Sequence, residues 1–309
     1  MSQQFTAILF PGQGSQEHGM GRDLAETSSQ AMELWKMAEQ ASGHPLREIF
    51  WEKNSREMDD TRYLQPALSV VNLNLWLHLD SESKPNYLAG HSLGEFSALC
   101  AAKVLDFKST IQLTSLRGRL MAEADPDGAG GMCAVLKLDQ EKVQELVQQV
   151  TDSTHRMLVV ANYNTPKQTV ISGEKQALEE MEPLVKDAKG RLVHLPVSGA
   201  FHSPMMREPA QELAKFMDKL DWKSPQIPVL FNSTASTEQN PDEIHKIMSR
   251  QMTSPVLFAQ LIQKMHELGV NRFVEVGPKG VLQKMLPQIL GKEADMETLN
   301  VSGLRDLEK

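Results

Sequence analysis

The residues best suited to do chemistry in this chain lie in one short segment, Gly-His-Ser-Leu-Gly at 90–94. The pattern G-x-S-x-G is typical of a nucleophile elbow, a tight strand-to-helix turn that exposes a serine hydroxyl above a sheet. An apolar run at 87–89 precedes the segment and a helical pattern over 93–102 follows it. Ser92 is therefore the candidate nucleophile, and the N–H of Leu93 is a natural donor to an oxyanion. The alternative is a glycine-rich turn in which Ser92 only caps a helix.

The base that such a serine requires has to be one of nine histidines. His91 adjoins the serine, so its side chain is expected to point away from the turn. His202 lies in the loop 198–204, between a predicted strand and a predicted helix. If the strand and the helix belong to different domains, this loop lies at the cleft between them, where ligands often bind. The alternative is a histidine that merely precedes a helix.

A buried cation is predicted in the helix expected over 107–124. Its apolar residues at 113, 116, 120 and 121 form one stripe with the spacing i, i+3, i+7 and i+8. Arg117 occupies i+4 on that stripe, whereas Arg119 does not. An inward arginine needs an anion because an unpaired buried charge is costly, and its planar guanidinium suits a carboxylate. That carboxylate belongs either to an Asp or Glu of the chain or to a substrate.

A second glycine-rich loop, Phe-Pro-Gly-Gln-Gly-Ser-Gln at 10–16, follows the first predicted strand. It lacks the Gly-Lys-Ser/Thr ending of a phosphate-binding P-loop. A loop at the carboxyl end of a strand is well placed to line a site, so one of its backbone N–H groups could hold an oxyanion. The alternative is a simple turn.

The elements that must position these residues alternate between strand and helix. Strands are predicted over 5–10, 87–89, 227–231 and 272–276. Helices are predicted over 24–41, 65–79, 93–102, 107–124, 205–220, 241–251, 257–268 and 280–290. Such alternation favours a mostly parallel sheet covered by helices.

The middle of the chain has a different pattern. A segment rich in Gly, Pro and Asp at 125–131 leads into strand, helix, strand, strand, helix and strand, at 132–138, 140–150, 157–162, 168–172, 175–188 and 191–197. That order is the ferredoxin-like βαββαβ arrangement. We therefore expect a large α/β domain built from 1–125 and 199–309, interrupted by a small ferredoxin-like subdomain at 126–198.

Composition argues against several classes of protein. With 32 Lys and Arg against 40 Asp and Glu, the net charge is −8, which argues against nucleic acid as the main ligand. Two cysteines, Cys100 and Cys133, cannot build a disulfide scaffold and fit a reducing, cytoplasmic setting. The most apolar long stretch, 64–79, is too short and too polar to span a bilayer. The N-terminus reads as a strand rather than as a signal peptide.

Six segments, in order along nearly the whole chain, resemble the malonyl-CoA:acyl-carrier-protein transacylase family of fatty acid synthesis. They are FPGQGSQ at 10–16, GHSLGE at 90–95, RGRLM at 117–121, NYNTP at 162–166, GAFHSP at 199–204 and SRQMTSPVLF at 249–258. Each motif alone is modest, but six in sequence are very specific. The resemblance implies an α/β-hydrolase-like core with an inserted ferredoxin-like subdomain, which agrees with the predicted order of elements.

The resemblance also implies roles for individual residues. Ser92 matches the nucleophile that carries the acyl ester, and His202 matches the general base. Gln251 matches the position whose carbonyl oxygen, from the main chain or the side chain, orients the histidine in place of a triad carboxylate. The N–H groups of Gln13 and Leu93 match the oxyanion hole.

Two further matches concern the acyl group. Arg117 matches the residue that pairs with the free carboxylate of a malonyl group, so the missing partner would arrive with the substrate. Phe201 matches the malonyl-type pattern, in which a bulky ring crowds an α-methyl branch and favours malonyl over methylmalonyl. Phe96 and Gly131 depart from the family pattern, where many relatives carry tyrosine and alanine, but neither position has a catalytic role.

The function that the resemblance implies is ping-pong transfer of a malonyl group from malonyl-CoA to the phosphopantetheine thiol of holo acyl carrier protein. No metal, redox cofactor, nucleic acid or membrane is expected to take part. A discrete acyltransferase of a polyketide synthase would use the same residues. A serine thioesterase would share the G-x-S-x-G pattern, although hydrolases of that fold usually place an acid between the serine and a late histidine. A non-catalytic module that binds CoA or a carrier protein would not need Ser92, His202 and Arg117 together.

Overall fold

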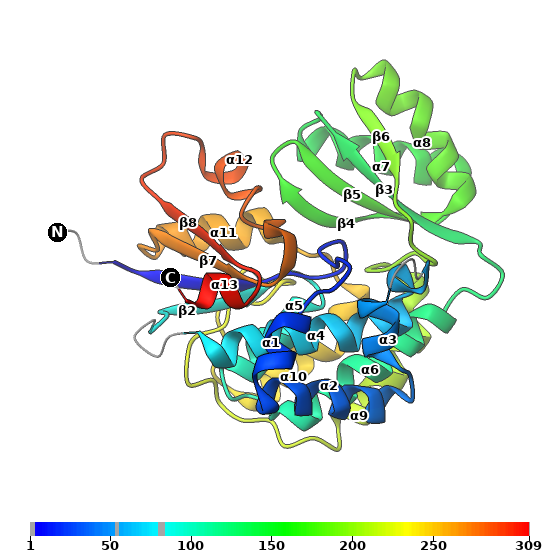
Figure 1. Cartoon of the computed structure of the whole chain (residues 1–309). Helices are drawn as coiled ribbons and strands as arrows, with labels where there is room; N and C mark the ends of the chain where they lie inside the picture. The colour runs from blue at the N-terminus through cyan, green and yellow to red at the C-terminus, as the bar shows by residue number, and fades with distance from the viewer. Residues whose placement is uncertain (1–3, 53–55, 80–83, 309) are drawn as a thin grey trace.

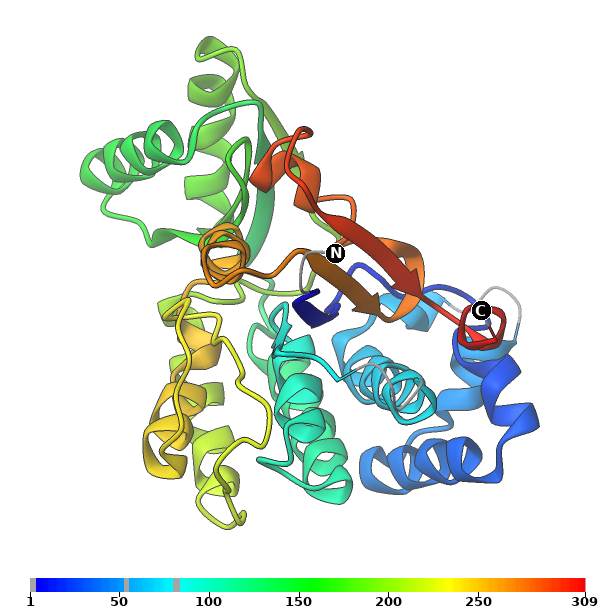
Figure 2. The same ribbon diagram turned by 90° about the vertical axis from the view of Figure 1, so that its left-hand side faces the viewer.

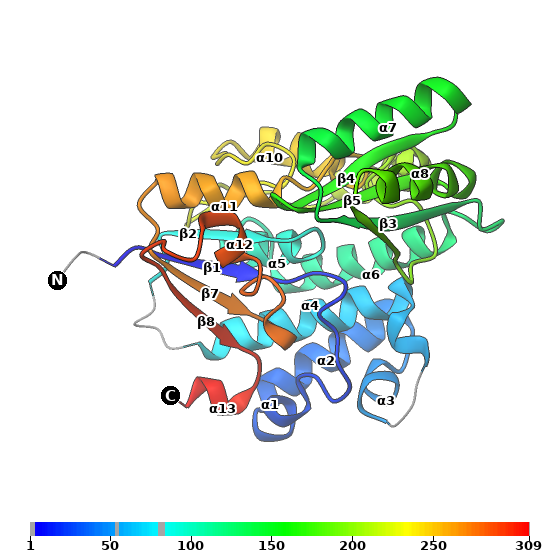
Figure 3. The same cartoon turned by 90° about the horizontal axis from the view of Figure 1, so that it is seen from above.

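A computed structural model of the protein describes residues 4–52, 56–79 and 84–308. Its first sheet has four parallel strands, which lie side by side in Figure 3. In spatial order they are β2 (Tyr87–Gly90), β1 (Thr6–Phe10), β7 (Arg272–Val276) and β8 (Glu297–Val301). Every residue of the central strand β1 is buried, as expected for a parallel strand covered on both faces.

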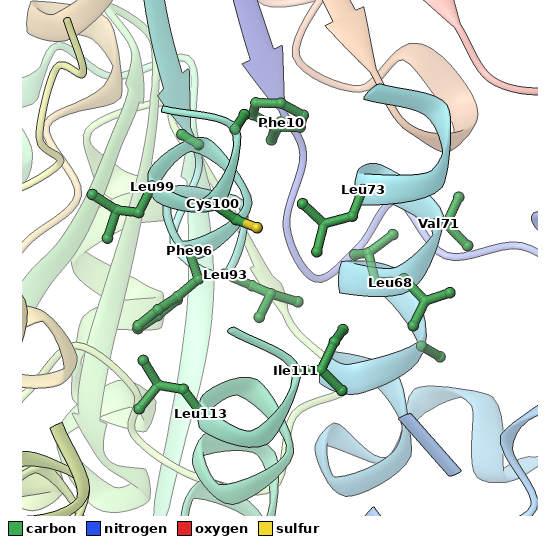
Figure 4. Packing of buried hydrophobic residues seen from close by; sticks show 14 of the residues in the cluster. Phe10, Leu68, Val71, Leu73, Leu93, Phe96, Leu99, Cys100, Ile111 and Leu113 are labelled. Carbon is green, nitrogen blue, oxygen red and sulfur yellow. The ribbon is translucent and has the colours of Figure 1, made fainter. Parts of the chain in front are cut away.

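Helices cover both faces of this sheet because alternate residues along a strand point to opposite sides. Ile8 and Phe10 of β1 belong to one core, whereas Ala7 and Leu9 belong to a second. Figure 4 shows part of the first core, where side chains from the segments 68–73, 93–100 and 111–113 lie below Phe10. Among the residues that the structure describes, nine helices contribute buried or partly buried residues to that core: α1 (Arg22–Thr27), α2 (Ser29–Ser42), α3 (Leu46–Trp51), α4 (Thr61–His78), α5 (Gly94–Ala101), α6 (Phe107–Glu123), α9 (Arg207–Met217), α10 (Pro241–Ser249) and α13 (Leu304–Leu307). The second core is formed with α11 (Phe258–Glu267) and α12 (Leu286–Leu290).

The second sheet is antiparallel and forms a separate unit above the helices in Figure 2. Its strands run in the order β4 (Leu158–Thr165), β5 (Gln168–Glu174), β3 (Gly130–Leu136) and β6 (Arg191–His194). The helices α7 (Gln140–Thr154) and α8 (Lys175–Asp187) cover one face of it (Figure 1). The opposite face contributes Met132, Ala134 and Val170 to the first core, so this sheet packs toward the rest of the molecule.

The order β3, α7, β4, β5, α8, β6 confirms the predicted ferredoxin-like arrangement. Together with the helix-covered parallel sheet it confirms the predicted fold class. The residue limits of the two domains, 1–125 with 199–309 and 126–198, stay a prediction. Within the described ranges, no helix has both the length and the apolarity needed to cross a bilayer.

Two predicted elements are wrong in their extent, each for a local reason. The strand expected over 227–231 forms only isolated bridges, Val229 with Leu88 and Leu230 with Thr237. Pro228 has no N–H to donate, so the segment cannot extend a ladder. The helix expected over 280–290 is instead a 3₁₀ turn, η4 (Pro278–Gly280), followed later by the short α12.

A further predicted helix, over 24–41, is two helices. Ser28 between them is extended, and its side chain accepts a hydrogen bond from the N–H of Ala31, so it caps α2 as serine commonly does. The sequence analysis predicted no helix or strand for three elements that the structure shows: α3, β8 and α13. Three 3₁₀ turns complete the description: η1 (Arg56–Asp59), η2 (Pro204–Met206) and η3 (Gln251–Thr253).

Candidate active site

Ser92 lies at the sharp turn between β2 and α5. Its φ angle of 50° is left-handed, a conformation that costs a residue other than glycine about 1–3 kcal/mol. The positions that flank Ser92 have room only for glycine. A Cβ on Gly90 would lie 1.9 Å from the carbonyl carbon of Gly94. A Cβ on Gly94 would lie 2.0 Å from the carbonyl oxygen of Phe10. The turn has the geometry of a nucleophile elbow, as the sequence predicts.

Asn232, which the sequence analysis did not single out, holds this turn in place. Its Oδ1 accepts a hydrogen bond from the N–H of Ser92 at 2.7 Å, and its Nδ2 donates to the carbonyl oxygen of Gly90 at 2.6 Å. The side chain is buried, so these bonds satisfy backbone groups that are wholly or partly shielded from water. No motif pointed to Asn232 because it acts on a turn 140 residues away in the sequence.

His202 reaches Ser92 from the loop that follows the antiparallel sheet. Its Nε2 lies 2.7 Å from Ser92 Oγ, and the residue is 5% exposed. Its Nδ1 lies 3.0 Å from the carbonyl oxygen of Ser254 and 3.2 Å from that of Gln251. Carbonyl oxygens only accept hydrogen bonds, so Nδ1 carries the proton and donates to both. The Nε2 lone pair therefore faces the serine hydroxyl, as in a nucleophile paired with its general base.

This geometry answers which oxygen of Gln251 contacts the histidine: it is the main-chain oxygen. Ser254 shares that contact and was missed in the sequence, although it lies within the segment SRQMTSPVLF. Burial, with a smaller effect of the Arg117 charge, lowers the pKa of His202 from 6.5 to about 3. The imidazole is therefore neutral at pH 7, which is the form that accepts a proton from serine.

Arg117 is buried beside this pair, as its place on the apolar stripe of α6 predicts. It is 1% exposed, whereas the side chain of Arg119 is 52% exposed. Its guanidinium donates to Ser92 Oγ at 3.2 Å and to the side-chain oxygens of Gln65 at 2.8 Å and Gln251 at 3.0 Å. It also lies over the ring of Phe96, 5.5 Å from the centroid, an arrangement that favours a cation. All three hydrogen-bond acceptors are neutral.

The side chain of Gln251 connects Arg117 with a buried carboxylate. Its Nε2 donates to the carbonyl oxygen of Ser92 at 2.8 Å and to Oε2 of Glu95 at 3.0 Å. Oε1 of Glu95 accepts from the N–H of Asn232 at 2.7 Å. Burial raises the pKa of Glu95 from 4.5 to about 7. The sequence carried a signal for this residue, since Glu95 is the only charged residue in the run 93–102.

The two predicted oxyanion donors belong to adjacent loops. A Cβ on Gly12 would lie 2.4 Å from the carbonyl oxygen of His91 and 3.5 Å from the nitrogen of Leu93, so the loop 10–16 packs directly on the elbow. The side-chain oxygen of Gln13 accepts a hydrogen bond from Thr61 Oγ1 at 3.3 Å. The roles of the Gln13 and Leu93 N–H groups stay a prediction that this proximity supports.

His91 and Phe201 take different positions around the site. His91 Nε2 lies 2.8 Å from Oδ1 of Asn164, and its ring packs edge-on against Phe258, so its side chain is engaged elsewhere, as predicted. Phe201 is buried in the first core next to His202. Its influence on the choice of acyl group stays a prediction.

The arrangement can transfer an acyl group through a serine. It supplies a hydroxyl, a neutral imidazole that accepts its proton, and a guanidinium for a charged end of the acyl group. The fold and the site thus define an acyltransferase, in agreement with a family model described as "Acyl transferase domain" that matches residues 8–309.

Solved structures share the whole fold. An acyl carrier protein S-malonyltransferase from Vibrio cholerae superimposes with a TM-score of 0.90 at 36% identity, covering 98% of each chain. A malonyl-transacylase in complex with its type II PKS acyl-carrier protein has a TM-score of 0.91 at 33% identity, covering 99% of this chain and 98% of that one. A malonyl CoA-acyl carrier protein transacylase from Haemophilus influenzae is 37% identical over 300 residues, which cover 96% of this chain and 95% of the relative. The chain belongs to the malonyl CoA-acyl carrier protein transacylase family.

Proposed function

We propose that this chain transfers a malonyl group from malonyl-CoA to the phosphopantetheine thiol of holo acyl carrier protein, in fatty acid biosynthesis, through an ester on Ser92. The observation that carries the proposal is a buried guanidinium 3.2 Å from Ser92 Oγ whose hydrogen-bond acceptors among the described residues are all neutral. An acyl group that ends in a carboxylate supplies an anion that can bind the guanidinium directly. The names of the relatives, which specify malonyl CoA and acyl carrier protein, support the choice of malonyl.

In the first half-reaction, Ser92 Oγ attacks the thioester carbonyl carbon while its proton passes to His202 Nε2. The N–H groups of Leu93 and Gln13 hold the resulting oxyanion, and each such donor is typically worth about 2.7–4 kcal/mol. The carbon–sulfur bond then breaks, and the CoA sulfur takes the proton from His202. A malonyl ester remains on Ser92, with its carboxylate on Arg117.

In the second half-reaction, the carrier thiol gives its proton to His202 and attacks the ester carbonyl carbon. The bond to Ser92 Oγ breaks and the serine regains its proton. The positive charge of Arg117 lowers the pKa of His202, so a malonyl carboxylate on that guanidinium makes His202 a better acceptor of the protons of Ser92 and of the carrier thiol. Ser92, His202 and the two thiols account for every bond change, and we therefore propose a reaction without metal or redox cofactor.

We also propose that the protein works in the cytoplasm. Cys100 and Cys133 are both free and buried, as is usual in a reducing compartment.

Mass spectrometry of the intact protein tests the proposal directly. The wild-type protein should gain one malonyl group from malonyl-CoA and lose it to holo carrier protein. Ser92→Ala should gain none, whereas Ser97→Ala, which removes another buried hydroxyl from the neighbouring helix, should react normally. A malonyl adduct of normal yield on Ser92→Ala would refute the role of this serine. Free malonate in place of malonyl carrier protein would instead identify a thioesterase.

A second candidate is malonyl transfer to the carrier protein of a polyketide synthase. The solved complex of a malonyl-transacylase with a type II PKS acyl-carrier protein favours keeping it. Comparing transfer rates to carrier proteins of the two kinds distinguishes the candidates.

A further inference from the structure

Glu95 is the buried carboxylate closest to the chemistry, and the reaction described above gives it no part. It is 0% exposed within α5. One of its oxygens accepts from the backbone N–H of Asn232 at 2.7 Å, and the other accepts from Nε2 of Gln251 at 3.0 Å. Both oxygens thus face donors, an arrangement that favours the ionised carboxylate, because it can accept a hydrogen bond at each oxygen.

Glu95 acts on Arg117 through the amide of Gln251. The carboxylate accepts the Nε2 hydrogen of this amide, and Oε1 of the same amide accepts from Arg117 at 3.0 Å. The three groups form a chain of carboxylate, amide and guanidinium. Burial raises the pKa of the Glu95 carboxyl, and the Arg117 charge opposes that rise. Burial lowers the pKa of Arg117, and the Glu95 charge opposes that fall. Each charge therefore favours the ionised form of the other.

Because Glu95 and Arg117 interact through the Gln251 amide and not directly, the carboxylate does not occupy the guanidinium. A carboxylate in contact with arginine commonly binds two N–H groups at once, which would occupy the side of the guanidinium that a substrate needs. Here the amide lies between the charges, and Arg117 Nε has no hydrogen-bond partner among the described residues. The guanidinium is thus balanced in charge while it keeps donor capacity for an incoming carboxylate.

The same carboxylate also connects the other parts of the site. Asn232, whose N–H it accepts, holds the Ser92 turn through its side chain. Gln251, whose amide it orients, contacts His202 through its main-chain oxygen. Glu95 therefore lies where the elbow, the segment that orients the base and the arginine meet.

We propose that Glu95 is a positioning residue for malonyl transfer: its carboxylate fixes the Gln251 amide and balances Arg117 without occupying the guanidinium. The inference rests on the proposed function, because it needs an acyl group that ends in a carboxylate. It predicts a larger loss for malonyl than for acetyl, since an acetyl group has no carboxylate to place on Arg117.

Glu95→Gln tests this with little change of shape. The new amide has one oxygen and one NH₂ group, so a donor must face either Asn232 N–H or the Gln251 amide. We expect the ratio of kcat/KM for malonyl-CoA to kcat/KM for acetyl-CoA to fall about tenfold or more. Glu275→Gln is the matched control, because Glu275 is also buried and each of its oxygens also accepts a hydrogen bond, here from backbone N–H groups at 3.0 and 2.7 Å in the turn after β7. Its ratio should equal that of the wild type.

Two further variants separate positioning from general damage. Gln251→Leu removes the bridging amide but keeps the main-chain oxygen beside His202, so it should lower the ratio as Glu95→Gln does, and it serves if Glu95→Gln does not fold. In an Arg117→Ala background, Glu95→Gln should change the ratio no further, because it acts through Arg117. A wild-type ratio in folded Glu95→Gln or in Gln251→Leu, or additive effects with Arg117→Ala, would overturn the proposal. Wild-type protein that forms no malonyl adduct would instead refute the proposed function itself.

Discussion

Replacing Asn232 with alanine is expected to loosen the turn that carries Ser92. The side chain satisfies the partly buried N–H of Ser92 at 2.7 Å and the buried carbonyl oxygen of Gly90 at 2.6 Å. Each buried polar group left without a partner costs about 1–3 kcal/mol. The two losses together should lower the free energy of unfolding by about 2–6 kcal/mol. Without the bond to its N–H, Ser92 is also free to leave its φ of 50°, which moves Oγ away from His202.

Two measurements follow these effects separately. Urea unfolding gives the change in stability, and the time course of the malonyl adduct in a single turnover gives the rate constant of acylation. We expect that rate constant to fall at least about tenfold, since a misplacement of about 1 Å can cost on the order of 10²-fold in rate. The matched control is Asn74→Ala, which removes a buried amide that donates to the carbonyl oxygen of Ala31 at 3.0 Å, between α4 and α2.

Asn74→Ala should lower stability and leave acylation by the folded protein unchanged. A wild-type rate of acylation in folded Asn232→Ala would refute the view that this side chain maintains the elbow. A loss of stability below about 1 kcal/mol would contradict the account of its two hydrogen bonds.

Other perturbations probe the cation, the elbow and the base. Arg117→Ala should cost malonyl transfer about 3 kcal/mol or more in kcat/KM and acetyl transfer far less, so equal losses in steady-state assays of the two CoA esters would make Arg117 merely structural. Gly94→Ala should prevent folding, judged by circular dichroism, because its Cβ would lie 2.0 Å from the Phe10 carbonyl oxygen. Gly131→Ala, whose closest contact would be a side-chain carbon at 3.2 Å, should fold with little change in Tm, and a well-folded Gly94→Ala would contradict the packing argument. The pKa of His202 is about 3 in the folded protein against 6.5 as its ordinary value, so the unfolded state binds more protons between these values and stability should fall as the pH drops below about 6.5, by up to about 1.4 kcal/mol per pH unit. Denaturant titrations between about pH 7 and 5 should show a smaller loss for His202→Gln, and equal losses would argue against a buried neutral imidazole.

Helices and strands whose apolar residues recur at a regular spacing were predictable, because those residues are the ones that the fold buries. The strand β7 agrees with its prediction, and α6 and α11 differ from theirs by one residue at one or both ends. Prediction failed where a local feature opposed the pattern. Pro228 removed an N–H from an apolar run, and the positive φ angle of Gly280 falls on the first residue of the helix predicted over 280–290.

The site was predictable where spacing alone marked a residue. Ser92 follows from the elbow pattern, and Arg117 follows from its place on an apolar stripe. His202 was ambiguous from its residues, because a loop before a helix is equally consistent with no role, and only the resemblance assigned it. Asn232 and Ser254 escaped because their parts in the site arise from contacts between segments that no local pattern relates.

The bonds that complete the site join residues far apart along the chain. Ser92 is separated by 110 residues from His202, by 140 from Asn232 and by 159 from Gln251. Contacts of such separation form late, because the entropy of loop closure has to be overcome first. A chain still on the ribosome that ends before residue 251 therefore carries the hydroxyl without the carbonyls that orient its base. We therefore expect the nascent protein to become reactive toward thioesters only after the segment 251–254 has been synthesised and has packed against His202.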